Sequence, residues 1–144
     1  GGWAVNGGRR DDEVGAVEMG LRLLVVGAGG AIGAIGRYLM TAAVHRVLPE
    51  TFPYGTLAVN MFGSLVVGLA AGIFAERAQA EGHLGVLFLI VGICGGFTTF
   101  SAFSADTYRL IERGAIASAA INAAAQGVGA LVAVFAGFWL ARQV

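Results

Sequence analysis

Charge is scarce in this sequence. Asp, Glu, Lys and Arg make up 12% of its 144 residues, about half of the roughly 25% that is usual in a soluble domain. Lysine is absent, so all nine basic residues are arginines, and the net charge is zero. A neutral chain has no basic surface to attract DNA or RNA, so we expect no nucleic-acid partner.

Cysteine and proline are almost as rare. The single cysteine, Cys94, excludes a disulfide within the chain and is expected to be a small packing residue. The two prolines, Pro49 and Pro53, fall in one short polar link, where a missing N–H does not interrupt a helix.

The side-chain sets that carry enzymatic chemistry are missing as well. The sequence has no Ser/His/Asp or Cys/His arrangement and no cluster with metal-ligand spacing, and both histidines, His45 and His83, fall in polar links. We therefore expect no enzyme. No Asp or Glu lies in the core of an apolar stretch, which argues against a proton relay through a membrane carboxylate.

Long apolar stretches dominate what is present. Hydrophobic residues make up 57% of the chain, and four stretches reach the roughly 20 residues that a helix needs to cross a bilayer core. They cover residues 21–44, 55–75, 84–104 and 114–141. Because lipid offers the backbone no hydrogen-bond partners, each stretch should be helical. The sequence predicts an all-α integral membrane protein whose four transmembrane helices form one domain over residues 21–144.

Residues 1–20 differ from the rest because they are polar and hold a run of mixed charge from Arg9 to Glu13. We expect a disordered tail or an upstream extension, since no cleavage site of a signal peptide follows. The glycine-rich stretch Leu23–Gly33 resembles a nucleotide-binding turn. However, Ile32 breaks the GxGxxG form and no alternation of strands and helices follows, which excludes that interpretation.

The arginines give no clear orientation in the membrane. Four spans place both termini on one side, with Arg22, Arg77 and Arg142 on that side and Arg46, Arg109 and Arg113 on the other. Arginine asymmetry orients most membrane proteins, so an even count predicts that the chain inserts both ways and forms antiparallel dimers. The alternative is that Arg9 and Arg10 of the tail fix one orientation.

Pairs of glycines spaced by four recur in three spans. These pairs are Gly29/Gly33, Gly68/Gly72 and Gly92/Gly96. Such pairs let helix backbones approach closely. The contact could lie within one subunit or between two.

The third span carries the most informative segment. Gly95 and Gly96 are followed by Thr98 and Thr99, and paired glycines and β-branched threonines are poor helix formers. The segment predicts a helix broken at mid-membrane, whose freed carbonyls a bound cation can satisfy. The alternative is an unbroken helix in which the hydroxyls bond back to their own carbonyls.

Phe100 and Phe103 follow the predicted break and share a helix face. The edge of a phenyl ring is electropositive, so two ring edges can stabilise an anion without trapping it. The alternative is that both rings face lipid or the protein core.

Two spans carry polar stripes with a spacing of four residues. The stripes are Thr56, Asn60 and Ser64 in the second span, and Ser118, Asn122 and Gln126 in the fourth. Neutral donors at this depth suit an anion pathway. The alternative is hydrogen bonding between helices that holds the bundle together. Arg37, near the far end of the first span, can reach the interface, and we expect a structural anchor or a vestibule charge.

Together these segments resemble the Fluc (CrcB) family of fluoride channels. The matching motifs are Gly30-x-x-Gly33-x-x-x-Arg37-Tyr38, Gly55-Thr56-Leu57-x-x-Asn60-x-x-Gly63 and Gly95-Gly96-Phe97-Thr98-Thr99-Phe100-Ser101-x-Phe103. They occur in the family's order on the expected spans, and the third motif is the most specific.

The resemblance implies a dual-topology homodimer in the inner (plasma) membrane that exports cytoplasmic fluoride passively through two separate pores. The pore residues that it implies are Asn60, Phe100, Phe103, Thr56, Ser101, Asn122 and Gln126. It also implies one structural Na⁺ at the dimer centre, held by the main-chain carbonyls of Gly95 and Thr98 from both subunits.

Three positions depart from the family pattern. Ala102 stands where the family usually has Thr, Gln126 where it often has Ser, and Ala130 where it often has Gly. A longer glutamine could narrow the route or supply an extra donor. The alternative function, a small four-span multidrug exporter, needs a carboxylate in the first span that this chain lacks. A non-transporting scaffold would leave the polar stripes without a purpose.

Overall fold

The computed structural model describes residues 5–75 and 83–143, with side chains from residue 14 onward, and every regular element in these ranges is a helix. Three helices are unbroken: α1 (Val5–His45), α2 (Tyr54–Phe74) and α6 (Ile116–Ala141). The remaining segment is built from four pieces: α3 (Leu84–Val86), η2 (Leu87–Cys94), α4 (Gly95–Phe97) and α5 (Phe100–Glu112).

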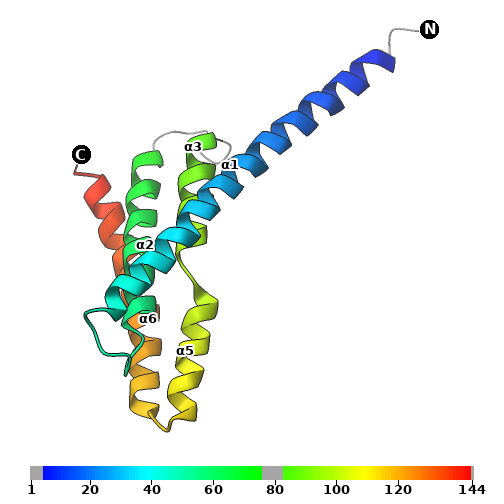
Figure 1. Cartoon of the computed structure of the whole chain (residues 1–144). Coiled ribbons are helices and arrows are strands. Elements are labelled where there is room, and N and C mark those ends of the chain that lie inside the picture. The colour runs from blue at the N-terminus through cyan, green and yellow to red at the C-terminus, as the bar shows by residue number, and fades with distance from the viewer. Residues whose placement is uncertain (1–4, 76–82, 144) are drawn as a thin grey trace.

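Four segments are long and apolar enough to cross a membrane: Val14–His45, Tyr54–Phe74, Leu84–Glu112 and Ile116–Ala141. The prediction of four helices able to span a membrane is therefore confirmed. They alternate in direction, so the start of α1 and the end of α6 lie at the same end of the bundle (Figure 1). The pair α2 and α6 has the most extensive contact, α1 crosses η2 and α4, and α5 packs against α6.

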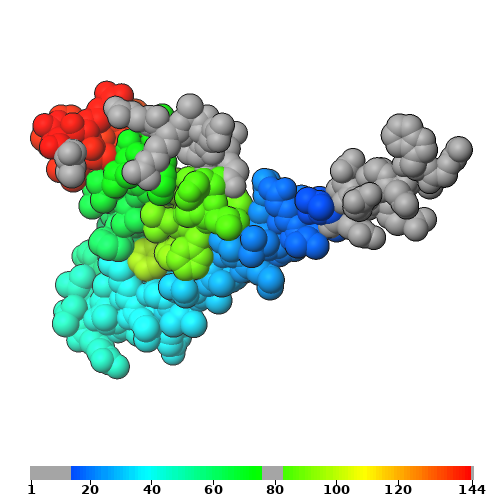
Figure 2. All heavy atoms as spheres, turned by 90° about the horizontal axis from the view of Figure 1, so that it is seen from above, coloured from blue at the N-terminus to red at the C-terminus, as the bar shows by residue number. Residues whose placement is uncertain are grey.

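Helix α1 is much longer than one crossing requires. Its 41 residues correspond to about 62 Å at 1.5 Å per residue, roughly twice the thickness of a bilayer core. Its first part leads away from the other helices (Figures 1 and 2). Residues 5–20 continue this helix, residues 1–4 lie outside the described part of the chain, and the disorder expected for the tail stays a prediction. Polarity alone does not stop a helix, and no proline interrupts this one.

The distribution of polarity is the reverse of that in a soluble protein. Four polar side chains are buried between the helices: Thr56, Thr99, Asn122 and Gln126. Large apolar side chains face outward, and on α6 Leu131, Phe135 and Trp139 are between 61% and 72% exposed. An apolar outer surface with polar side chains turned inward among small apolar ones fits a lipid environment.

The segment between α2 and α6 is bent, as the sequence predicts. Thr98 (φ −75°, ψ 155°) and Thr99 (φ −151°, ψ 114°) are extended and separate α4 from α5. Gly95 and Gly96 remain helical, so the break lies at the threonines and not at the glycines. Before them, η2 is a π-helix of eight residues. Such stretches are rare and often lie at functional sites.

Helix α5 extends past Ser104 to Glu112, further than the predicted end at residue 104. The polarity of residues 105–113 predicts a link between two spans here. Their side chains in fact bond within the helix: Arg109 pairs with Asp106 at 2.9 Å between NH1 and Oδ1, and the Tyr108 hydroxyl donates to Glu112 Oε1 at 2.8 Å. Gly114, with φ at 74°, then reverses the chain, and α6 begins at Ile116.

The glycine pairs that the sequence analysis singled out lie at helix contacts within one chain. A Cβ atom on Gly33 of α1 would overlap the main-chain oxygen of Ile93, and one on Gly68 of α2 would overlap that of Val134. Close contacts of this kind are present at all three pairs, Gly29/Gly33, Gly68/Gly72 and Gly92/Gly96. The intrasubunit alternative for these glycines is therefore confirmed.

Replacing Gly33 by alanine should destabilise the protein, because the new methyl group meets backbone that cannot move aside. We expect a loss of about 1–3 kcal/mol, as for other overpacked sites. Gly27 of the same helix has open space around it, so Gly27→Ala is the matched control and should leave stability unchanged or slightly raised. Thermal unfolding of the purified protein in detergent measures both, and equal melting temperatures would contradict the packing argument.

Candidate anion pathway

The centre of the site is a pair of hydrogen bonds between Asn60 on α2 and Thr99 at the break. The main-chain N–H of Thr99 donates to Asn60 Oδ1 at 2.8 Å, and Asn60 Nδ2 donates to the Thr99 carbonyl oxygen at 3.1 Å. A backbone N–H can only donate and a backbone carbonyl can only accept. The Asn60 amide is therefore held in one orientation.

The second hydrogen of Asn60 Nδ2 is directed to Gln126 on α6, whose Oε1 accepts it at 2.9 Å. Both donors of Asn60 are thus engaged, because a side-chain amide nitrogen carries two hydrogens. Gln126 must present its oxygen to Asn60, which leaves Gln126 Nε2 facing elsewhere. That nitrogen is buried without a hydrogen-bond partner among the described residues. Gln126 is therefore the side chain here that has a donor to spare.

The break also frees two main-chain carbonyls. In a continuous helix the carbonyls of Gly95 and Thr98 would accept from the N–H groups of Thr99 and Ala102. Here the Thr99 N–H donates to Asn60, and the Ala102 N–H donates to Thr99 Oγ1 at 3.1 Å, a helix N-cap. The two carbonyls that the family resemblance assigns to Na⁺ have thus lost their helical donors. Carbonyl oxygens of unwound helices are suitable Na⁺ ligands.

A cavity of about 430 Å³ opens beside this network. It brings together Asn60, Gln126, Phe100 and Phe103 from three different helices. The two rings lie edge to face, with centroids 5.3 Å apart and planes at 61°. Phe100 is 78% exposed, so its ring extends out of the subunit rather than into a core. Four of the seven predicted pore residues therefore share one cavity.

The other three predicted pore residues lie elsewhere. Ser101 is exposed, and its hydroxyl lies 3.2 Å from Thr99 Oγ1. Asn122 is fully buried, and its Nδ2 donates to Thr107 Oγ1 at 2.9 Å. This bond ties α6 to α5, as in the structural alternative for the polar stripes. The acceptor Asn122 Oδ1 is buried without a partner among the described residues.

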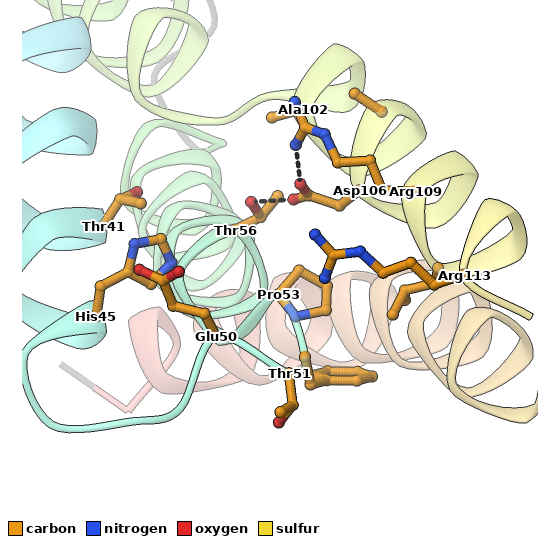
Figure 3. A pocket seen from close by; sticks show the side chains of 13 residues that line it. Thr41, His45, Glu50, Thr51, Pro53, Thr56, Ala102, Asp106, Arg109 and Arg113 are labelled. Atoms are coloured by element: carbon orange, nitrogen blue, oxygen red, sulfur yellow. Dashed lines mark hydrogen bonds and ion pairs between the residues drawn. The ribbon is translucent and has the colours of Figure 1, made fainter. Parts of the chain in front are cut away.

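Thr56 lies in a second pocket, of about 480 Å³, which is lined by the end of α1, the link after it, the start of α2 and α5 (Figure 3). Its hydroxyl donates to Asp106 Oδ2 at 2.6 Å, so its proton is not free for an anion. The other carboxylate oxygen, Oδ1, accepts from Arg109. Thr56 lies one turn before Asn60, and Asp106 lies one turn after Phe103. The pocket and the Asn60 cavity are therefore about one helical turn apart along both α2 and α5.

Asp106 and Thr107 were missed by the sequence analysis, which placed both in a link. One signal for them was available: they follow Phe103 at spacings of three and four residues, the same helix face. Arg37 lines neither cavity, and no ion pair of its guanidinium is found in the described part of the chain. Its role as an anchor or vestibule charge stays a prediction.

The fold and the site define a multi-pass membrane protein with a cavity beside a broken helix, lined among the described residues by apolar and uncharged polar side chains. The chain belongs to the CrcB family: the family described as "CrcB-like protein, Camphor Resistance (CrcB)" matches residues 24–138. This membership confirms the resemblance drawn from the helix motifs.

Relatives cover nearly the whole membrane domain. A protein of Nitrobacter winogradskyi named "Fluoride-specific ion channel FluC" is 50% identical over 77% of this chain and 90% of its own length. "Fluoride-specific ion channel FluC 1" of Nitrobacter hamburgensis is 47% identical over 83% and 94%. The "Fluoride-specific ion channel FluC" of Agrobacterium fabrum is 44% identical over 86% and 98%. These relatives are ion channels by name, which confirms the expectation that the chain is not an enzyme.

Replacing Thr99 by valine should destabilise the protein at the helix break. Valine lacks the oxygen that caps α5, and the loss of an N-cap usually destabilises by about 1 kcal/mol. Thr99→Ser keeps the hydroxyl and is the matched control. Thermal unfolding in detergent compares the two, and a Val variant as stable as the Ser variant would show that the cap does not hold the break.

Proposed function

We propose that this protein is a fluoride-selective channel through which cytoplasmic fluoride leaves the cell passively across the inner membrane. The observation that carries the proposal is the cavity in which the Asn60 amide, the free Gln126 donor and the Phe100–Phe103 pair meet. It lies on a chain whose relatives of almost equal length are named fluoride-specific ion channels.

The chemistry of the cavity suits a small, strongly hydrated anion. Fluoride must exchange its water for other donors, and here the donors are amide N–H groups and the positive edges of phenyl rings. None of the described residues that line this cavity is charged. An anion is therefore bound weakly enough to leave again, as conduction requires.

Gln126 and Asn60 have different parts in this scheme. Gln126 Nε2 is buried and has no hydrogen-bond partner among the described residues, so a shift of this side chain would let it donate to fluoride without breaking a bond of its own nitrogen. To accept from Asn60 it must displace Gln126 Oε1, because both Asn60 hydrogens are engaged. Gln126 thus supplies its own Nε2 donor and also controls the access of fluoride to Asn60 Nδ2. This supports the extra-donor alternative for the Gln126 departure.

The driving force comes from the acid–base chemistry of fluoride. The uncharged acid crosses the lipid and dissociates inside, and the negative cell interior then drives the anion outward through the pore. Such export needs a selective path and no coupled reaction. The lack of carboxylates in the Asn60 cavity is consistent with transport that is not coupled to protons.

A second copy completes the pore in this proposal. One subunit leaves Phe100 mostly exposed and its cavity open along one side, which a partner would close. We propose an antiparallel homodimer with two pores, because the even arginine distribution favours insertion both ways. The freed carbonyls of Gly95 and Thr98 from both subunits would hold one Na⁺ between the two broken helices, where its charge would satisfy four oxygens that lack helical donors.

Fluoride efflux from proteoliposomes, followed with an ion-selective electrode, tests the channel. Rapid fluoride release without chloride release is expected. Replacing both Phe100 and Phe103 by leucine should slow fluoride release at least about ten-fold, because leucine has no electropositive edge. Phe135→Leu on the outward face of α6 is the matched control and should release fluoride at the original rate. No fluoride release from a well-folded dimer would overturn the proposal.

Removal of Na⁺ should lower the melting temperature of the purified protein, because an ion that binds only the folded state stabilises it by mass action. A ten-fold rise in Na⁺ above its dissociation constant should add about 1.4 kcal/mol. Choline at the same ionic strength is the control. Identical melting curves in Na⁺ and choline would argue against the cation site, whatever the fluoride measurement shows.

A further inference from the structure

The pocket that contains Thr56 also contains a carboxylate, that of Asp106, which is unfavourable next to an anion path. The carboxylate of Asp106 lies one helical turn from Phe103 and is only 18% exposed. A negative charge at this depth repels an approaching anion, and the repulsion is stronger where water is scarce. If the neighbouring cavity passes fluoride, as proposed above, this charge must be compensated locally.

Arg109 is placed to compensate it. Its NH1 lies 2.9 Å from Asp106 Oδ1, and the pair is formed within one helix at a spacing of three residues. The remaining oxygen of the carboxylate is occupied by the Thr56 hydroxyl. Figure 3 shows the guanidinium of Arg109 turned to the carboxylate, whereas that of Arg113 extends toward the middle of the pocket. In the part of the chain that the structure describes, Arg113 forms no ion pair.

The other charged groups around this pocket keep its formal balance at zero. Glu50 comes from the link after α1 and His45 from the end of α1, and both line the pocket with Asp106, Arg109 and Arg113. With His45 neutral, two carboxylates face two arginines. Loss of either arginine therefore changes the total charge by the same amount, but only the loss of Arg109 exposes the carboxylate next to the pore.

We propose that Arg109 controls the entry of anions into the channel: it neutralises Asp106 and so lets an anion approach Asn60 and the phenylalanines through the Thr56 pocket. Asp106 in turn holds the Thr56 hydroxyl and ties α5 to α2. The pocket is thus an entrance whose local charge is set by one ion pair. Arg113 adds a positive charge further from the carboxylate of Asp106. It therefore contributes only to the general attraction of anions to the pocket.

Four variants in the full-length protein test this, with fluoride efflux from proteoliposomes at low ionic strength as the readout. Arg109→Gln should slow efflux about ten-fold, within the range of electrostatic effects on the entry of charged ligands. Asp106→Asn combined with Arg109→Gln should restore the rate to within about two-fold of the original protein. Arg113→Gln, with the same change in charge, should have a much smaller effect. Arg109→Lys keeps the charge and should remain active.

The salt dependence of fluoride efflux gives a second readout. A purely structural role of Arg109 would not change it. An impermeant salt at high concentration screens exposed charges, so the deficit of Arg109→Gln should shrink as ionic strength rises. Efflux of Arg109→Gln at the original rate, or equal losses in the Arg109 and Arg113 variants, would overturn the proposal. So would a double variant as slow as Arg109→Gln. Absence of fluoride efflux from the unmodified protein would instead refute the channel function itself.

Discussion

The hydrogen bonds between Asn60 and the backbone of Thr99 are the interaction on which the rest of the site depends. They satisfy the N–H and the carbonyl of Thr99 where the third helix unwinds. In lipid an unsatisfied backbone group costs several kcal/mol. A break is therefore stable only where a side chain forms hydrogen bonds with the exposed N–H and carbonyl groups, here those of Thr99. Asn60 does so, and it consequently has one amide hydrogen left, which is directed to Gln126. The orientation of Gln126 and its free donor follow from this one contact.

Much of the architecture was predictable because lipid restricts the backbone so strongly. Four apolar stretches could only be helices, and the paired glycines and threonines indicated where one of them would be interrupted. The exact place was not predictable: the glycines stayed helical, and the threonines took extended conformations because Thr99 has partners on either side. Such partners come from α2 and from the residues after the break, and a local propensity cannot show them.

The site was predicted less completely than the fold. The sequence identified Asn60, Phe100, Phe103 and Gln126, which share a cavity, because polar spacing and the family motifs both point to them. It placed Thr56 in the same path, although the hydroxyl of Thr56 is used by Asp106. Asp106 was overlooked because charged residues after an apolar stretch usually mark a link. Only the continuation of α5 to Glu112 brings that carboxylate back against α2.

The contact between α1 and the upper half of the broken helix has a mechanical consequence. Gly33 meets the carbonyl of Ile93 and Gly96 meets that of Gly30, so two backbones touch with no side chain between them. A joint of this kind has no rotamers to exchange and little room to slide. The upper half of the broken helix is therefore held rigidly against α1. In the proposed channel this joint would keep one wall of the cavity in place.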